Sequence, residues 1–265
     1  MFPWYGYIGL LFVALGEILI FLKIEPFTTY LFFLCLWIGY ILIVDAWVLA
    51  RTKSSRLKNN HCKFWLLFLL SAIFWWFYEL LNYFIENWRY EGVGEPQWIM
   101  YTLAFSTVLP AIIETSDLLR SFSIFQRLKW RVHVNKRKVC WLILIGIICL
   151  ILPFVVPYYA YSLVWLSMFF LLDPINFMMK SPSILEDLKR GRATIFWSLM
   201  IGALICGFFW EFWNYWAPAK WFYDVPVLGF LKIFEMPILG YLGYMPFGLS
   251  LYAMYNFSLS LFRKK

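Results

Sequence analysis

The segment that decides the fold is residues 193–216, which read ATIFWSLMIGALICGFFWEFWNYW. An α-helix of about 20 apolar residues crosses the hydrocarbon core of a bilayer, and this one carries a single ionisable side chain, Glu211. The whole chain has the same character: 63% of its 265 residues are hydrophobic, 14% are charged and the mean hydropathy is +0.71. A soluble domain is about half apolar and about a quarter charged. The composition therefore excludes an ordinary soluble enzyme, a disordered chain and a disulfide-rich secreted chain.

We predict an all-α fold, a polytopic transmembrane bundle of about eight spans. The count drops to seven if the hairpin around Pro153 and Pro157 only dips into the bilayer. Glu17 interrupts the first apolar run and no small-residue cleavage site follows it, so we expect a span there rather than a signal peptide. The predicted spans are residues 4–23, 28–50, 64–86, 98–119, 139–158, 159–178, 193–216 and 230–257.

Basic residues are distributed unevenly between the two sides of such a bundle. Three loops (51–63, 120–138 and 179–192) and the C-terminus fall on one side and hold 19 of the 23 Lys and Arg residues. Because cytoplasmic loops carry the excess of Lys and Arg, we expect a cytoplasmic-membrane protein with both termini in the cytoplasm. Anionic lipid explains these membrane-adjacent loops better than nucleic acid does, so we expect the bilayer, and no nucleic acid, as partner. The sequence does not indicate an oligomeric state.

The positions of the histidines and cysteines in the sequence argue against metal and redox chemistry. The two histidines, His61 and His133, lie in basic loops, and the five cysteines show no paired spacing. Haem and histidine-rich di-iron sites need imidazoles inside the bundle. We therefore expect no metal and no cofactor.

A polar pattern, E-x-x-N-Y followed by W-x-Y and an acid, occurs twice and predicts an internal repeat. We assign residues 1–138 to a first four-helix membrane repeat and residues 139–265 to a second. An even number of spans makes the repeats parallel, related by a pseudo-two-fold axis along the membrane normal. The first copy contains Glu79, Asn82, Tyr83, Trp88, Tyr90 and Glu91, and the second contains Glu211, Asn214, Tyr215, Trp221, Tyr223 and Asp224. Further matches are Asp45 with Asp173, Ser55 with Ser183, and Glu95-Pro96 with Glu235 before Pro237.

Acids within spans are costly and are functional candidates by default. In a low-dielectric bundle with few bases they favour the protonated form and can donate protons. For Asp45 and Asp173, at the cytoplasmic helix ends, an ion pair or a helix-end contact is the simpler interpretation. The intramembrane acids are Glu17, Asp45, Glu79, Glu114, Asp173, Glu211 and Glu235.

The repeated Glu and Asn share one helix face, which fits a structural clamp or an acid with its orienting group. Two copies favour the functional interpretation, although Trp and Tyr are also typical of an interfacial aromatic belt. Candidate catalytic residues are Glu211 and Glu79 as proton donors, Asn214 and Asn82 as positioning groups, and Glu235 as partner acid or base. Candidate substrate-binding residues are Trp210, Trp213, Tyr215, Trp76, Tyr83, Trp221, Tyr223, Trp88 and Tyr90.

With a helix acid, W-x-Y and a Glu beside a Pro all present twice, the layout resembles the integral-membrane lycopene cyclase-domain proteins and related membrane terpenoid cyclases. The resemblance implies cofactor-independent cyclisation or isomerisation of an isoprenoid, as in carotenoid biosynthesis, with aromatic faces stabilising a cation. The family has three spans per repeat, where this chain has four. Two other classes stay open: a proton- or cation-coupled carrier with paired carboxylates at the repeat interface, and a non-catalytic assembly protein.

Overall fold

The computed structural model describes residues 1–24, 31–224 and 229–262. The predicted start of the second span, 28–30, and the basic residues 263–265 lie outside this part of the chain. Over the described residues, seven helices are long and apolar enough to cross a membrane, which confirms the predicted helical class and is compatible with a multi-pass membrane protein. They are α1 (Trp4–Phe21), α3 (Phe32–Thr52), α5 (His61–Ile85), α6 with α7 (Gln97–Arg120), α9 (Lys136–Val155), α10 with α11 (Pro157–Met178) and α13 (Thr194–Trp216).

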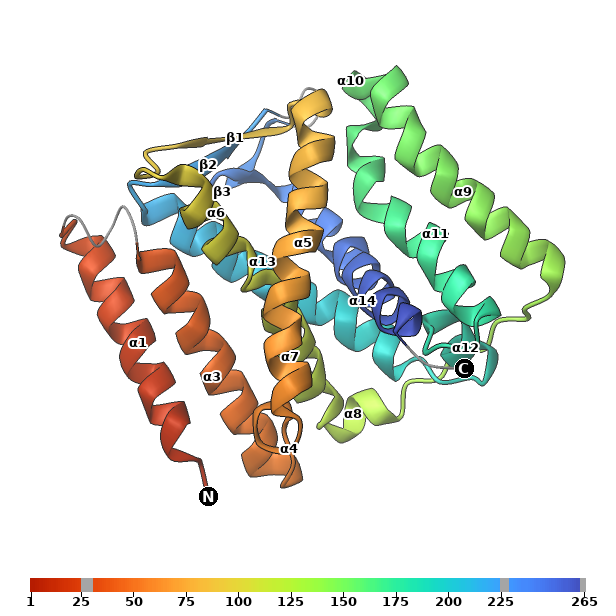
Figure 1. The fold of residues 1–265 in the computed structure, drawn as a ribbon, viewed down its shortest axis with the longest axis horizontal. Coiled ribbons are helices and arrows are strands. Elements are labelled where there is room, and N and C mark those ends of the chain that lie inside the picture. Colours follow the sequence, from red (N-terminus) through yellow and green to blue (C-terminus); the bar gives the residue numbers. More distant parts are fainter. Residues whose placement is uncertain (25–30, 225–228, 263–265) are drawn as a thin grey trace.

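The long helices run between two ends of the molecule that differ in structure (Figure 1). Short helices cluster at one end, where the chain also starts, and the strands lie at the other. The short helices at the first end are α4 (Arg56–Asn59), α8 (Ser123–Gln126) and α12 (Ile184–Lys189). The short helix α10 (Pro157–Ala160) lies at the other end, as do the strands β1 (Trp88–Glu91), β2 (Lys220–Tyr223), β3 (Lys232–Ile233) and β4 (Met236–Pro237). The basic loops therefore gather at the end opposite the strands.

The helix α7 (Val108–Arg120) forms the centre of the bundle, and every residue from Val108 to Ser116 is buried. It contacts α3, α5 and α13. By contrast α1 and α9 flank the bundle on opposite sides (Figure 1) and expose most of their apolar side chains. Such exposure is expected for helices whose solvent is lipid.

The prediction of one helix over residues 230–257 is wrong in its first half. The chain there forms β3, β4 and a 3₁₀ turn over Ile238–Gly243, and helix α14 extends only over Tyr244–Leu261. Pro237 cannot donate a backbone hydrogen bond, and Gly240 and Gly243 disfavour helix. These three residues delay the helix by several turns.

The two W-x-Y segments lie between predicted spans, and the structure shows them as strands β1 and β2 of one antiparallel pair. Trp88 lies opposite Tyr223 and Tyr90 lies opposite Trp221. Each Trp of one copy of the motif therefore faces the Tyr of the other copy.

Asp45 and Asp173 make the helix-end contacts expected of them. Asp173 accepts the backbone N–H groups of Ile184 and Leu185, each over 2.8 Å, at the start of α12. Asp45 accepts the N–H of Leu57 over 3.1 Å and the Ser55 hydroxyl over 2.8 Å at the start of α4. Both carboxylates therefore stabilise short helices at the basic end of the bundle.

Candidate functional site

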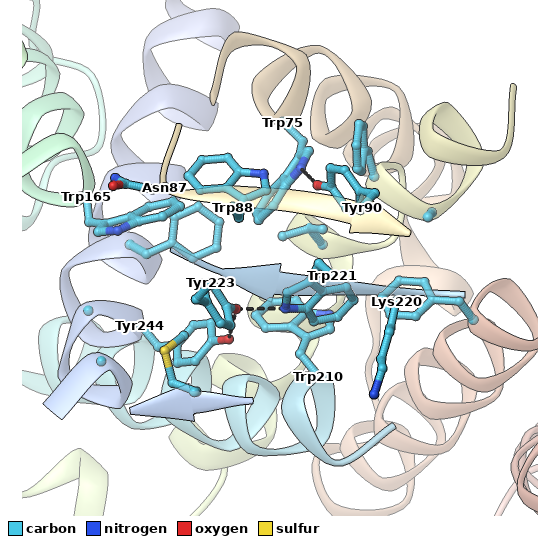
Figure 2. A pocket seen from close by; sticks show the side chains of 18 of the residues that line it. Trp75, Asn87, Trp88, Tyr90, Trp165, Trp210, Lys220, Trp221, Tyr223 and Tyr244 are labelled. Atoms are coloured by element: carbon cyan, nitrogen blue, oxygen red, sulfur yellow. Dashed lines mark hydrogen bonds between the residues drawn. The ribbon is translucent and has the colours of Figure 1, made fainter. Parts of the chain in front are cut away.

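A cavity of 430 Å³ lies beneath the β1–β2 pair, among the ends of α5, α6, α11, α13 and α14. Fourteen of its 32 lining residues are aromatic, and Lys220 is the single charged residue among those that the structure describes there. Figure 2 shows indole and phenol rings from both strands and from the helices turned toward one another around this space. The size is typical of a small-molecule site, and the walls suit an apolar guest.

The strands supply one aromatic wall of the cavity. Alternate residues of a strand point to the same face of a sheet, so Trp88 and Tyr90 of β1 share a face with Trp221 and Tyr223 of β2. All four line the cavity, whereas Arg89 between them is exposed and pairs with Asp224 over 2.5 Å. The two W-x-Y motifs are therefore site residues, and not only an interfacial belt.

Asn82 and Asn214 hold these strands in place. The Asn82 amide donates to the Trp88 carbonyl over 2.8 Å, and its oxygen accepts the Trp88 N–H over 3.2 Å. Asn214 does the same with Trp221, at 2.9 Å in both directions. Neither amide contacts the neighbouring glutamate directly, because each is used on the backbone of the Trp.

The carboxyl of Glu79 is held by three donors on the same oxygen, Oε1. The Tyr90 hydroxyl donates over 2.5 Å, the Trp75 indole over 2.8 Å and the Trp88 indole over 3.1 Å. Trp75 lies four residues before Glu79 and therefore on the same helix face. This spacing is the signal that could have identified Trp75 from the sequence.

Glu211 has the corresponding place in the second motif but a different set of donors. Its Oε1 accepts the Tyr223 hydroxyl over 2.6 Å and the Tyr244 hydroxyl over 2.5 Å. Its Oε2 is buried and has no hydrogen-bond partner among the described residues. Where the first copy has Trp75, the second has Gly207, and the Tyr244 ring occupies the space.

The strand tyrosines separate the carboxyls from the cavity. Tyr90 and Tyr223 line it, and neither Glu79 nor Glu211 does. Burial first, and then the charge of the adjacent glutamate, raises the pKa of Tyr90 and of Tyr223 well above the ordinary value. Both phenols are therefore neutral hydrogen-bond donors at any physiological pH.

Glu235 lies at the rim of the site rather than beside Glu211. Its carboxylate pairs with the Lys220 ammonium over 3.1 Å, and this is its one ion pair within the described parts of the chain. The pair joins the loop after β3 to the first residue of β2. The structure thus gives Glu235 a partner that the sequence analysis did not propose.

Of the remaining predicted substrate-binding residues, one lines the cavity and four do not. Trp210 lines the cavity. Trp213 is buried away from it and donates to Glu17 over 3.1 Å. The other three lie outside the cavity and are partly or largely exposed: Trp76 at 39%, Tyr215 at 41% and Tyr83 at 77%. Cavity residues that the sequence analysis missed include Trp75, Trp165, Tyr244 and Phe247.

Within the described residues, no group of three or more His, Cys, Asp or Glu side chains is arranged to hold a metal ion. No protein-family model, curated protein or solved structure matches the chain.

Proposed function

We propose that the chain is an integral-membrane enzyme that acts on a hydrophobic lipid or isoprenoid by proton transfer from a carboxylic acid. The observation that supports this proposal best is the aromatic cavity with a buried glutamate behind two of its tyrosines. A cavity with one charged lining residue selects apolar molecules. The chemistry needs no redox group, because protonation of an alkene followed by loss of a proton leaves the mass unchanged.

Glu211 is the proton donor in this proposal. A carboxylic acid is a much stronger acid than a phenol, and Glu211 is fully buried. The Tyr223 and Tyr244 hydroxyls lie between Glu211 Oε1 and the cavity. When Oε1 carries the proton, a tyrosine O–H that turns from Oε1 toward the cavity gives its proton to the alkene carbon, while the phenol oxygen takes the proton of Glu211. The carbocation that forms lies among indole and phenol faces, each of which contributes about 0.5–2 kcal/mol of cation–π stabilisation. An adjacent carbon then loses a proton to the phenol oxygen, and the same tyrosine passes its own proton back to the Glu211 carboxylate, which regenerates Glu211 and completes a cyclisation or an isomerisation.

Glu79 is the less reactive of the two acids in this scheme. Three donors hold one of its oxygens in place, which suits a structural anchor better than a mobile acid. In this scheme Glu211 both gives and recovers the proton, and Glu79 has a structural role.

The arrangement also supports the proposed internal duplication. In an antiparallel pair related by a two-fold axis, residue i of one copy faces residue j of the other and the reverse. The register, with Trp88 opposite Tyr223 and Tyr90 opposite Trp221, obeys this rule. We propose that α14 is the eighth crossing element, with the end that carries α4, α8 and α12 in the cytoplasm and the chain in the cytoplasmic membrane.

The test is comparative mass spectrometry of lipids from isoprenoid-producing cells that express the wild type, Glu211→Gln or Glu91→Gln. Gln keeps the shape of Glu and lacks the transferable proton. Glu91 is an exposed acid of β1 and serves as the matched control. We expect a product of unchanged mass and shifted retention with the wild type and the control, and none with Glu211→Gln. Identical extracts from all three stably expressed proteins would contradict the enzyme.

A carrier is the second candidate, and one observation favours it. Glu114 of α7 is fully buried, its Oε1 lies 3.9 Å from Arg56 Nε, and neither carboxyl oxygen has a hydrogen-bond partner among the described residues. Asp45, Glu114 and Glu211 are buried acids on three helices that contact one another through α7. Proton flux in liposomes that is abolished by Glu114→Gln would favour this candidate over the enzyme.

A further inference from the structure

A second cavity, of 570 Å³, lies at the opposite end of the bundle from the aromatic one. It is formed by the last turns of α3 and α7, the short helices α4 and α8, and the first residue of α13. Of its 13 lining residues, all except Val48 are polar: Thr52, Ser54, Ser55, Arg56, Asn59, Asn60, Lys63, Asp117, Arg120, Ser121, Gln126 and Thr194. We call this cavity the basic cleft.

Three cations and one carboxylate line the basic cleft, and the carboxylate fixes two of the cations in position. Asp117 Oδ2 accepts Arg56 Nε over 2.6 Å, and Asp117 Oδ1 accepts Arg120 Nη1 over 2.8 Å. The terminal Nη groups of Arg56 make no hydrogen bond to another described residue. The same holds for the ammonium of Lys63. The cleft therefore has a net positive charge and free donors.

Two neighbouring groups do not change that sign. Glu114 lies 3.9 Å from Arg56 Nε but is fully buried behind it and does not line the cleft. Arg51 adds a further cation beside the rim, because its Nε donates to the Ser121 hydroxyl over 2.7 Å. Its guanidinium also lies 3.9 Å from the Phe122 ring centre, which restricts its motion.

The positive-inside rule accounts for the number of basic residues at this end, but it does not require them to converge. Nor does it require a shared aspartate to orient two guanidinium groups toward a cleft rich in hydroxyls and amides. Guanidinium forks and hydroxyl donors together match the oxygens of a phosphate group.

We propose that the basic cleft binds a phosphate group at the membrane surface. The group can belong to an anionic lipid headgroup or to a soluble phosphate compound, and the chemistry of recognition is the same. The proposal is independent of the chemistry assigned to the aromatic cavity.

The full-length protein in phosphatidylcholine nanodiscs is the sample for the test. Phosphatidylglycerol is titrated into it and binding is measured by native mass spectrometry, with inorganic phosphate as competitor. The cleft variant is Lys63→Gln with Arg120→Gln. The matched control is Lys136→Gln with Arg137→Gln, which removes the same charge from exposed residues at the start of α9. Lys63→Gln alone breaks no ion pair within the described residues, so it replaces the double variant if that protein does not fold.

We expect the Kd for phosphatidylglycerol to rise about tenfold in the cleft variant, which is a loss of about 1.4 kcal/mol, and to stay near the wild-type value in the control. Displacement of the lipid by inorganic phosphate would identify a soluble phosphate compound as the source, and no displacement would identify a lipid headgroup. Equal weakening in the cleft and control variants would overturn the proposal, as would wild-type protein that shows no preference for phosphatidylglycerol over phosphatidylcholine.

Discussion

Gly207 controls which donor reaches Glu211, and its replacement by alanine is the most informative perturbation of the site. A Cβ added at Gly207 would lie 2.3 Å from Cδ2 of the Tyr244 ring. Carbon atoms in contact stand about 3.5–4.0 Å apart, so the ring must retreat by more than about 1 Å. The Tyr244 hydroxyl donates to Glu211 Oε1 over 2.5 Å, and such a retreat moves that distance toward about 3.5 Å, where a hydrogen bond is lost.

The expected magnitude follows from three terms. Overpacking of a well-packed site costs about 1–3 kcal/mol, and the lost hydrogen bond costs about 1 kcal/mol. Alanine recovers about 1 kcal/mol over glycine inside a helix. The net loss in the free energy of unfolding is therefore about 1–3 kcal/mol, which lowers Tm by roughly 3–10 °C for a chain of this size.

The assay is thermal unfolding of the purified protein in one detergent, with Gly243→Ala as the control. A Cβ at Gly243 would lie 3.7 Å from Trp165, which is an ordinary contact, and the residue has helical backbone angles. A double-mutant cycle with Tyr244→Ala isolates the clash, because Gly207→Ala should cost nothing once the ring is gone. If the two substitutions lower Tm additively, or if Gly207→Ala leaves Tm unchanged, the Tyr244 ring does not pack against Gly207.

Two further predictions concern the strands. Asn82→Ala and Asn214→Ala should each lower the free energy of unfolding by about 2 kcal/mol, because each leaves a Trp backbone N–H and C=O without a partner. Thermal melts check this prediction. Wild-type stability in both variants would contradict the stabilising role of the two Asn–Trp contacts. Burial, followed by the charge of Glu79, raises the pKa of Tyr90, so the folded state keeps a proton that the unfolded chain loses above pH about 10. Stability should therefore fall as pH rises above about 10, and Tyr90→Phe should make that fall shallower in alkaline unfolding curves; an identical slope would contradict the burial of Tyr90.

The sequence predicted the helices well because apolar runs of span length have few alternative structures. It failed after Pro237, where the average over residues 230–257 is apolar but the local backbone preferences of Gly240 and Gly243 oppose a helix. Composition averaged over a span hides such a local conflict. The repeated polar motif is visible in the sequence because polar residues are rare in this chain, so matching polar positions stand out.

The strand pair could not be predicted from either motif alone. Each strand has four residues, and a run that short does not distinguish a strand from a turn or a helix end. The pairing is also distant in sequence, since Trp88 lies opposite Tyr223. For the same reason the helix spacing pairs Asn82 with its neighbour Glu79, whereas its hydrogen-bond partner is the Trp88 backbone, which comes later in the chain.

The β1–β2 pairing shows how the E-x-x-N-Y and W-x-Y segments of each motif fold together. The Asn near the end of each helix binds both backbone polar groups of the Trp that opens the W-x-Y segment. This clasp fixes where the strand starts, and the two-residue period of the strand then brings Trp and Tyr to one face. The Tyr hydroxyl donates to the Glu that lies one turn before the Asn in the helix, over 2.5 Å in the first copy and 2.6 Å in the second. The copies differ four residues before the Glu, where Trp75 donates to its own acid and Gly207 instead admits Tyr244 from another helix. A purely structural motif has no reason to exchange a local donor for a distant one, so this exchange is the feature of the site that most favours different tasks for the two acids.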